Sequence, residues 1–173
     1  MRSPLSARDP ERLDIGLGRS AIRAVVVLPG GTSALIVVTH LHHLGPDEAA
    51  RDEQTAALLD WLDRAATPPL TIAIGDFNAD PAEPTCARMR SAGFRSAFAE
   101  ANGQDPPVTW PSGLQAPAMD TDGTPECLDY IWVRGEVRVL SARLVFDRPD
   151  PEDPTLYPSD HLGISATLEV GAP

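Results

Sequence analysis

The stretch that decides the fold is LTIAIGDFNAD, residues 70–80. Its first half, Leu70–Ile74, is a short apolar run typical of a buried strand. Two carboxylates and a carboxamide follow at once, as Asp76, Asn78 and Asp80. A strand that ends in so many oxygen atoms predicts one of two things. It is a sharp turn, because Asp and Asn bond their own backbone, or it is a functional site at the edge of a sheet.

The segments around this stretch predict an α/β fold with a mixed β-sheet. Two β-branched runs separated by Pro29, Gly30 and Gly31 indicate an antiparallel hairpin. One later segment has apolar residues at helical spacing, and another is closed by Gly93 as a helix would be. The expected elements are strands at 21–28 and 34–39, helices at 46–66 and about 84–92, and strands at 70–74, 128–133, 137–146 and 163–170. Residues 1–20 are expected to be poorly ordered, and residues 21–173 to form one domain.

Composition limits the partners that this chain can have. Its 173 residues carry a net charge of −11 at pH 7. Such a surface repels polyanions and lacks the basic footprint of a nucleic-acid binder, although a bound divalent cation can invert the local field. Cys86 and Cys127 have no metal-type spacing; they could pair, but two packed thiols are the favoured interpretation. No signal-like or membrane-length apolar run stands out, so a cytoplasmic location is expected.

Polar side chains gather where the expected strands begin or end. The clusters are Thr39–His43, Gly75–Asn78, Asp129 and Ser159–His161. If the last strand runs antiparallel to the others, these clusters meet on one rim of the sheet. Each has a structural interpretation too: a half-buried histidine, a turn, or solvated side chains at His42 and the residue after it. Asp129 is harder to explain this way, because a carboxylate within an apolar run needs a partner, and a histidine is a natural one.

Two metal motifs begin in this sequence and then fail. A calcium-binding EF-hand loop that started at Asp76 would need Gly and Glu where Pro81 and Ala87 stand. The zinc motif of metallo-β-lactamases would continue after its two histidines with Asp and His, where Leu44 and Gly45 stand. Neither family is therefore indicated.

Taken together, the motifs THL, GDFN, LDYIWV and SDH, in this order, resemble the second half of the endonuclease/exonuclease/phosphatase superfamily. The resemblance covers roughly residues 21–170. It implies a DNase I-like α/β sandwich of two sheets. It also implies Mg²⁺-dependent cleavage of a phosphodiester or a phosphomonoester.

For the GDFN loop, the resemblance implies a role in holding the attacking water. Asp76 would be the general base or an orienting carboxylate for that water, and Asn78 would hydrogen-bond the water or the phosphate. The resemblance assigns no role to Asp80, His42 or His43.

The remaining roles concern the phosphoryl group. By the same resemblance, His161 would stabilise the charge of the transition state, and Asp129 would orient that imidazole. His40 would touch another phosphate oxygen. Asp160 would help to hold the metal, Mg²⁺ or Mn²⁺.

The chain departs from the superfamily at its front. Complete members have a strand that ends in Asn and another that carries a metal-binding Glu before the hairpin that begins here at Ala21. Nothing before that residue matches, and Glu11 lies in a polar stretch. The chain is therefore expected to be N-terminally truncated, half of a split protein, or a non-catalytic domain, with truncation preferred. Exposed apolar surface and an unpaired sheet edge should result, and another chain could supply the missing half.

Two functions of different classes follow from these observations. The preferred one is a metal-dependent phosphohydrolase that acts by in-line attack of an activated water and is weak or inactive in this form. The alternative is a non-catalytic binding or assembly module with the same fold. A zinc hydrolase built on His40, His42 and His43 is disfavoured. The acidic balance favours a small or lipid-like phosphoester over nucleic acid as substrate.

Overall fold

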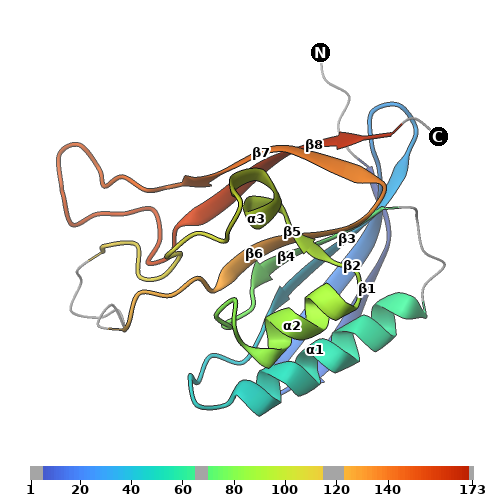
Figure 1. Ribbon diagram of the computed structural model, residues 1–173, viewed down its shortest axis with the longest axis horizontal. Helices are drawn as coiled ribbons and strands as arrows, with labels where there is room; N and C mark the ends of the chain where they lie inside the picture. The colour runs from blue at the N-terminus through green and yellow to red at the C-terminus, as the bar shows by residue number, and fades with distance from the viewer. Residues whose placement is uncertain (1–5, 65–69, 115–122, 172–173) are drawn as a thin grey trace.

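The computed structural model describes residues 6–64, 70–114 and 123–171, which form two β-sheets and three helices (Figure 1). The strands are β1 (Ser6–Gly16), β2 (Arg19–Val27), β3 (Ser33–His40), β4 (Leu70–Asp76), β5 (Arg95–Ser96), β6 (Asp129–Gly135), β7 (Val137–Val145) and β8 (Gly163–Val170). The helices are α1 (Glu48–Asp63), α2 (Pro84–Ser91) and α3 (Ala97–Asn102).

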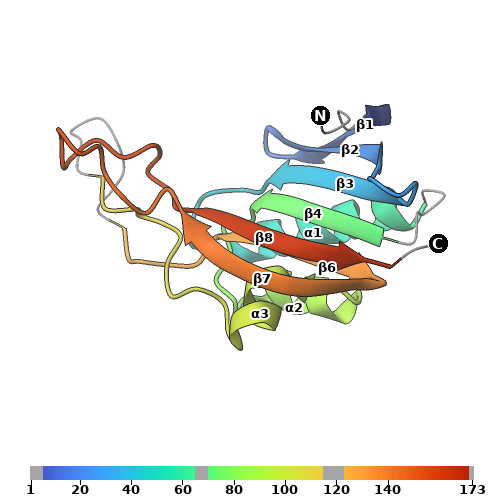
Figure 2. The same cartoon turned by 90° about the horizontal axis from the view of Figure 1, so that it is seen from above.

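The larger sheet has six strands in the order β1-β2-β3-β4-β6-β5. Its β3–β4 pair is parallel and its other pairs are antiparallel, so the sheet is mixed. The antiparallel β7–β8 hairpin forms a second sheet, which faces the larger one from above (Figure 2). The predicted DNase I-like α/β sandwich is confirmed.

The main core lies between the larger sheet and helices α1 and α2. Along β3, Leu35 and Val37 belong to this core, so the residues between them point to the opposite face. Leu58 and Leu62 of α1 are fully buried against it. None of the helices in the described segments is long and apolar enough to cross a bilayer.

Helix α1 also buries a charged residue. Arg51 is 1% exposed, and its guanidinium donates to Glu83 Oε2 and to the carbonyls of Leu44 and Gly45. With its donors satisfied in this way, the buried charge is tolerated. The interaction fastens the loop before α1 to the segment that leads into α2.

The prediction that residues 1–20 are poorly ordered is wrong for the part that the structure describes. Residues 6–16 form β1, an edge strand antiparallel to β2. Most of its side chains are exposed, and only Ile15 is buried. The strand is held by backbone hydrogen bonds to β2 and not by burial of its side chains. Its sequence therefore lacks the alternation of apolar and polar residues from which a strand is predicted.

The expected strands at 128–133 and 137–146, which follow one another in the sequence, lie in different sheets. β6 pairs with β4 and β5, whereas β7 pairs with β8 in the other sheet. Gly135, with φ of +108°, lies at the turn between them. The short elements β5 and α3 were not predicted, since α3 depends on a local cap in which Ser96 Oγ accepts from the backbone of Ala99.

Candidate active site

The GDFN loop is both a turn and part of a polar site. At Gly75, φ is +141°, and a Cβ would lie 1.9 Å from the carbonyl oxygen of Thr39, so only glycine lets β4 approach β3 this closely. Asn78 has φ of +48°, a conformation that asparagine tolerates. Its backbone N–H donates to Asp76 Oδ1 at 2.8 Å. The turn holds the Asp76 carboxylate in place.

Strand register brings three of the predicted residues together on one rim. His40 is the neighbour of Asp76 across β3 and β4, and Asp76 is the neighbour of Asp129 across β4 and β6. His161, just before β8, approaches them from the second sheet. Its Nδ1 lies 2.8 Å from Oδ2 of Asp129. The two sheets therefore meet at this rim, although β8 is not a strand of the larger sheet.

A buried threonine connects the two sides of the rim. Thr109 Oγ1 accepts hydrogen bonds from the backbone N–H groups of Leu128 (2.8 Å) and Asp129 (3.1 Å). Its carbonyl accepts from the N–H of Leu162 at 2.7 Å. Sequence reasoning gave Thr109 no role. It positions the backbone on both sides of the Asp129–His161 pair.

Asp160 is fixed by the neighbouring loop. Its carbonyl accepts from Ser112 N–H at 2.7 Å, and Ser112 Oγ donates to the carbonyl of Ser159 at 2.7 Å. Ser159 Oγ in turn accepts from the N–H of His161 at 3.1 Å. Asp160 lines the cavity described next, but it is not one of the three residues whose donor atoms gather most closely.

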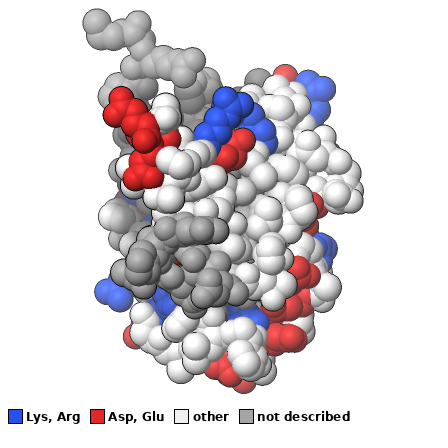
Figure 3. All heavy atoms as spheres, turned by 90° about the vertical axis from the view of Figure 1, so that its left-hand side faces the viewer, with Lys and Arg blue, Asp and Glu red and all other residues white. Residues whose placement is uncertain are grey.

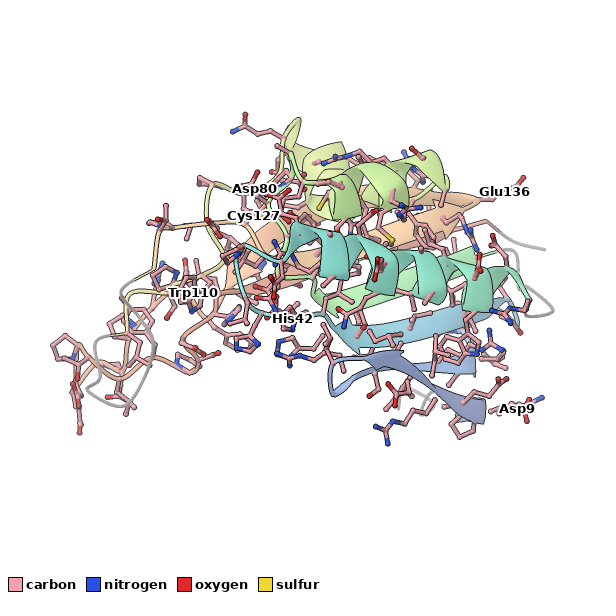
Figure 4. The ribbon with its side chains drawn as sticks, turned by 90° about the horizontal axis from the view of Figure 1, so that it is seen from below. Asp9, His42, Asp80, Trp110, Cys127 and Glu136 are labelled. Atoms are coloured by element: carbon pink, nitrogen blue, oxygen red, sulfur yellow. The ribbon has the colours of Figure 1, made fainter. Side chains whose placement is uncertain are left out.

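A cavity of about 790 Å³ opens over this rim. Arg19 lines it with a positive charge, beside the imidazoles of His40 and His43, and Trp110 lines it close to His161, with 6.4 Å between the ring centroids. Its far end is acidic, with the carboxylates of Glu48, Glu83 and Glu126. Figure 4 shows Trp110 among the loops beyond the strand ends, with His42 at the same end of the molecule. Sequence reasoning missed Arg19 and the acidic end, because neither stands in a motif.

The pKa of the Asp76 carboxyl group is raised toward neutral pH. Burial, and then the nearby charge of Asp129, raise its pKa from 3.8 to about 6. The hydrogen bond from Asn78 and the charges of His161 and Arg19 act in the opposite direction. A carboxylate with this pKa remains ionised at neutral pH and is a stronger base than an exposed one.

The pKa of the His161 imidazole is shifted upward. Burial alone would lower its pKa, but the hydrogen bond to Asp129 and the charges of Asp129, Asp76 and Asp160 raise it above the ordinary value. With Nδ1 engaged by Asp129, Nε2 is the ring nitrogen left for the cavity.

The pKa of His40 is shifted downward. Burial, Arg19 and His161 lower its pKa, although its Nε2 lies 3.3 Å from Oδ2 of Asp76. This short contact would by itself favour the imidazolium. Burial and the neighbouring cations outweigh it, so a neutral ring is favoured over an ion pair at this contact.

The other histidines do not join this group. His42 was expected to be solvated, and that is wrong: it is buried, its Nε2 lies 2.8 Å from Asp47 Oδ2, and its backbone N–H donates to Gln54. His43 is exposed, with Nδ1 3.0 Å from a guanidinium nitrogen of Arg19. The histidines have separate partners, which leaves the disfavoured zinc site without a geometric basis.

The residues with donor atoms close enough to share a cation are Asp76, Asp129 and His161, all within 4.8 Å of one another. Two of these donors are carboxylates, the hard oxygen ligands that Mg²⁺ and Mn²⁺ prefer. The imidazole nitrogen of His161 already faces Asp129. The donor set therefore fits a divalent cation through its carboxylates, with His161 as their cationic neighbour.

Sequence comparison identifies relatives of this chain. The sequence model described as "Endonuclease/Exonuclease/phosphatase family" matches residues 2–161. The prediction that nothing before residue 21 resembles the superfamily is therefore wrong. Nocturnin of Xenopus laevis is 33% identical over 148 residues, which are 78% of this chain and 36% of that protein. The chain thus spans little more than a third of the length of this curated relative.

Solved structures share the fold. TDP2 of D. rerio, complexed with a single-strand DNA product, has a TM-score of 0.79 at 19% identity, over 96% of this chain and 69% of that chain. An endonuclease/exonuclease/phosphatase from Bacteroides vulgatus has a TM-score of 0.75 at 21% identity, over 96% and 67%. The human Nocturnin catalytic domain with a bound sulfate anion has a TM-score of 0.69 at 26% identity, over 94% and 60%.

Proposed function

The chain belongs to the endonuclease/exonuclease/phosphatase family, and from this premise we propose that it is a metal-dependent hydrolase of phosphoric esters. The reaction is an in-line attack of an activated water on phosphorus. One observation carries the proposal: Asp76, whose pKa is raised to about 6, faces the Asp129–His161 pair in one cavity. A base and a cation side by side suit a reaction that activates water and builds negative charge.

Asp76 and Asn78 act on the water. Asp76 accepts its proton or orients it. The amide nitrogen of Asn78 donates to the Leu41 carbonyl and to Asp76, each at 3.2 Å. Both amide hydrogens are thus engaged, so its Oδ1 is left as an acceptor. An acceptor suits a water molecule and not a phosphate oxygen, which favours the water as the partner of Asn78.

His161 acts on the phosphoryl group. Its Nε2 donates a hydrogen bond to a non-bridging oxygen, and the positive charge held by Asp129 stabilises the transition state. His40 donates from a neutral ring to a second oxygen. Arg19, at the same wall of the cavity, adds a further positive charge.

A divalent cation completes the proposed site. Asp160, on the cavity wall, would hold Mg²⁺ or Mn²⁺ beside the close carboxylates of Asp76 and Asp129, together with water and the phosphate. When bound, the ion would neutralise charge on the phosphate and on the leaving oxygen.

The test is hydrolysis of bis(p-nitrophenyl) phosphate by the purified chain with Mg²⁺ or Mn²⁺, with EDTA in a parallel reaction. We expect turnover that needs the metal and disappears in His161→Ala. Leu140→Ala, on the exposed β7 strand, is the matched control and should keep full turnover. Turnover that persists in EDTA, or in His161→Ala, would contradict the proposed mechanism.

The substrate we propose is a small or lipid-like phosphoester. The net charge of −11 and the acidic end of the cavity disfavour a long polyanion. On the loop face in Figure 3, the visible basic groups, all arginines because the chain has no lysine, are separate and interrupted by acidic ones. Competition between a small diester and a single-stranded oligonucleotide tests this. A kcat/KM for the oligonucleotide above that of the diester would reverse the assignment.

The alternative is a non-catalytic module with the same fold. It is favoured by one observation, that Asp160 lies outside the close donor group of Asp76, Asp129 and His161. Thermal unfolding with and without Mg²⁺ distinguishes the two functions. Metal-dependent stabilisation together with turnover supports the hydrolase, and a folded chain with neither supports the module.

A further inference from the structure

The two arginines that line the cavity differ in how their charges are compensated. Arg51 is buried, and its guanidinium donates to Glu83 and to two backbone carbonyls. Arg19 is only partly buried, and no carboxylate in the described part of the chain forms an ion pair with it. Although acidic residues outnumber arginines by 25 to 14, the charge of Arg19 is therefore left for an anion from outside the chain.

A histidine holds the Arg19 guanidinium in place. One terminal nitrogen of Arg19 lies 3.0 Å from Nδ1 of His43. Because arginine has donors and no acceptor, the guanidinium donates and Nδ1 accepts. In this contact the His43 ring is neutral and carries its proton on Nε2. The pair therefore keeps the full positive charge of Arg19, which a carboxylate partner would neutralise, and it retains N–H donors on both residues.

The Arg19–His43 pair lies to one side of the proposed reaction centre. Asp76 is on β4, His40 is beside it on β3, and Arg19 begins β2, the next strand of the sheet (Figure 2). Neighbouring strands are about 4.8 Å apart, so the backbone of Arg19 lies about 10 Å from that of Asp76. His161 approaches from the other side of Asp76, where β6 lies. A phosphate beside Asp76 and His161 therefore has Arg19 as a separate neighbour.

The rest of the cavity wall disfavours a second negative charge. Glu48, Glu83 and Glu126 line it, and of the described arginines only Arg51, already engaged by Glu83, lies among them. An anionic group next to these carboxylates is repelled, whereas one next to Arg19 is attracted. The distribution of charge thus gives a doubly anionic substrate one favourable orientation.

We propose that the Arg19–His43 pair is an anion subsite, and that the substrate is a phosphoester with a second anionic group close to the phosphate that is cleaved. This assignment rests on the proposed function and specifies its substrate class. The second group is a phosphate or a carboxylate, because the guanidinium presents paired N–H donors that match either one. Arg19 determines specificity by binding this group, and His43 positions the guanidinium.

Binding tests the subsite without catalysis. Isothermal titration in EDTA compares two probes that carry two anionic groups, methylenebisphosphonate and phosphonoacetate, with methylphosphonate, which carries one. We expect at least one of the first two to bind about tenfold more tightly than methylphosphonate, and which of them does so distinguishes phosphate from carboxylate. This advantage should disappear in Arg19→Gln. Arg143→Gln, which removes the same charge from an exposed position on β7, should bind as the wild type does.

Turnover tests the role in specificity. Release of inorganic phosphate is measured with ethylene glycol bisphosphate and phosphoglycolate, and with ethyl phosphate as the substrate that carries one anionic group. In Arg19→Gln, KM for the preferred doubly anionic substrate should rise about tenfold with little change in kcat, and ethyl phosphate should be affected less than about threefold. Arg19→Lys keeps the charge without the paired donors and should restore only part of the loss.

Two outcomes would overturn the subsite. One is equal binding of the three titration probes. The other is an equal loss for all substrates in Arg19→Gln, which would mean that Arg19 binds the phosphate that is cleaved. A binding advantage that depends on Arg19, with no turnover of any compound, would contradict the proposed hydrolase and still support the subsite. Circular dichroism of each variant separates lost binding from lost folding.

Discussion

Two histidine–aspartate pairs in this molecule have the same length and different surroundings. The Nδ1 of His161 lies 2.8 Å from Asp129, and the Nε2 of His42 lies 2.8 Å from Asp47. The first pair joins two sheets across a cavity. The second joins residues five positions apart in the loop that leads into α1. The distance alone therefore does not distinguish a candidate catalytic pair from a structural one.

The neighbours of each pair make the difference. Asp129 lies beside a second carboxylate, Asp76, whose burial raises its pKa to about 6. Among the described residues, neither His42 nor Asp47 belongs to the group whose donor atoms lie within 4.8 Å of one another. The backbone N–H of His42 donates instead to Gln54 of α1. A concentration of charge beside a cavity is the feature that predicts chemistry.

The largest expected effect is on activity at His161. In His161→Gln, kcat for bis(p-nitrophenyl) phosphate should fall by about 10³-fold, because the cationic donor to the phosphoryl oxygens is lost. The free energy of unfolding in urea should change by less than about 1 kcal/mol, since glutamine keeps a donor for Asp129 and both side chains of the pair retain some contact with solvent, at 26% and 22% exposure. A variant that loses its stability in step with its activity would place this pair in the same class as His42–Asp47.

Asp76→Asn should lower activity and raise stability. We expect kcat to fall by about 10²-fold, because the base is removed. The folded pKa of Asp76, about 6, exceeds its ordinary 3.8, so its contribution to stability is fully present below 3.8 and is lost as the pH rises through about 6. In EDTA at pH 8, Asp76→Asn should therefore be more stable by about 1–3 kcal/mol.

Urea unfolding of both proteins at pH 4 and pH 8 checks the sign. The difference in the free energy of unfolding should be close to zero at pH 4 and largest at pH 8. An Asp76→Asn variant that is less stable than the wild type at pH 8 would mean that the ionised carboxylate is favourably paired in the fold.

Thr109→Val should have an intermediate effect on both quantities. It leaves the N–H groups of Leu128 and Asp129 without their acceptor, which costs about 1–3 kcal/mol. The displaced Asp129 should lower kcat about tenfold, with little change in KM. Thr109→Ser keeps the hydroxyl and should restore kcat. If the serine variant behaves like the valine one, the hydroxyl is not what positions Asp129.

The smallest effect is expected at His42. In His42→Gln, kcat should match the wild type, and the free energy of unfolding should fall by about 1 kcal/mol through the weakened contact with Asp47. Chemical denaturation and steady-state kinetics on the same preparation measure both. A tenfold loss of kcat without unfolding would show that the loop before α1 takes part in the reaction.

Elements with their own apolar pattern could be predicted from the sequence. The hairpin of β2 and β3, helix α1 and strand β4 lie close to their expected positions because each has an apolar pattern of its own. Helix α2 was located instead by Gly93, just after its end. β1 could not be found in this way, since an exposed edge strand depends on the partner to which its backbone bonds. Arg19 and Thr109 were missed for a similar reason, because their importance comes from distant residues.

The sequence by itself determined which polar residues follow or precede the apolar runs, and so which side chains the rim could receive. Only the tertiary structure decided that Asp129 meets His161 while His42 meets Asp47, that β7 and β8 form a separate sheet, and that Val38 is left exposed. The physical reason is range. Strand and helix periodicity is set by neighbours in sequence, whereas burial, charge proximity and pKa are set by residues that only packing brings together.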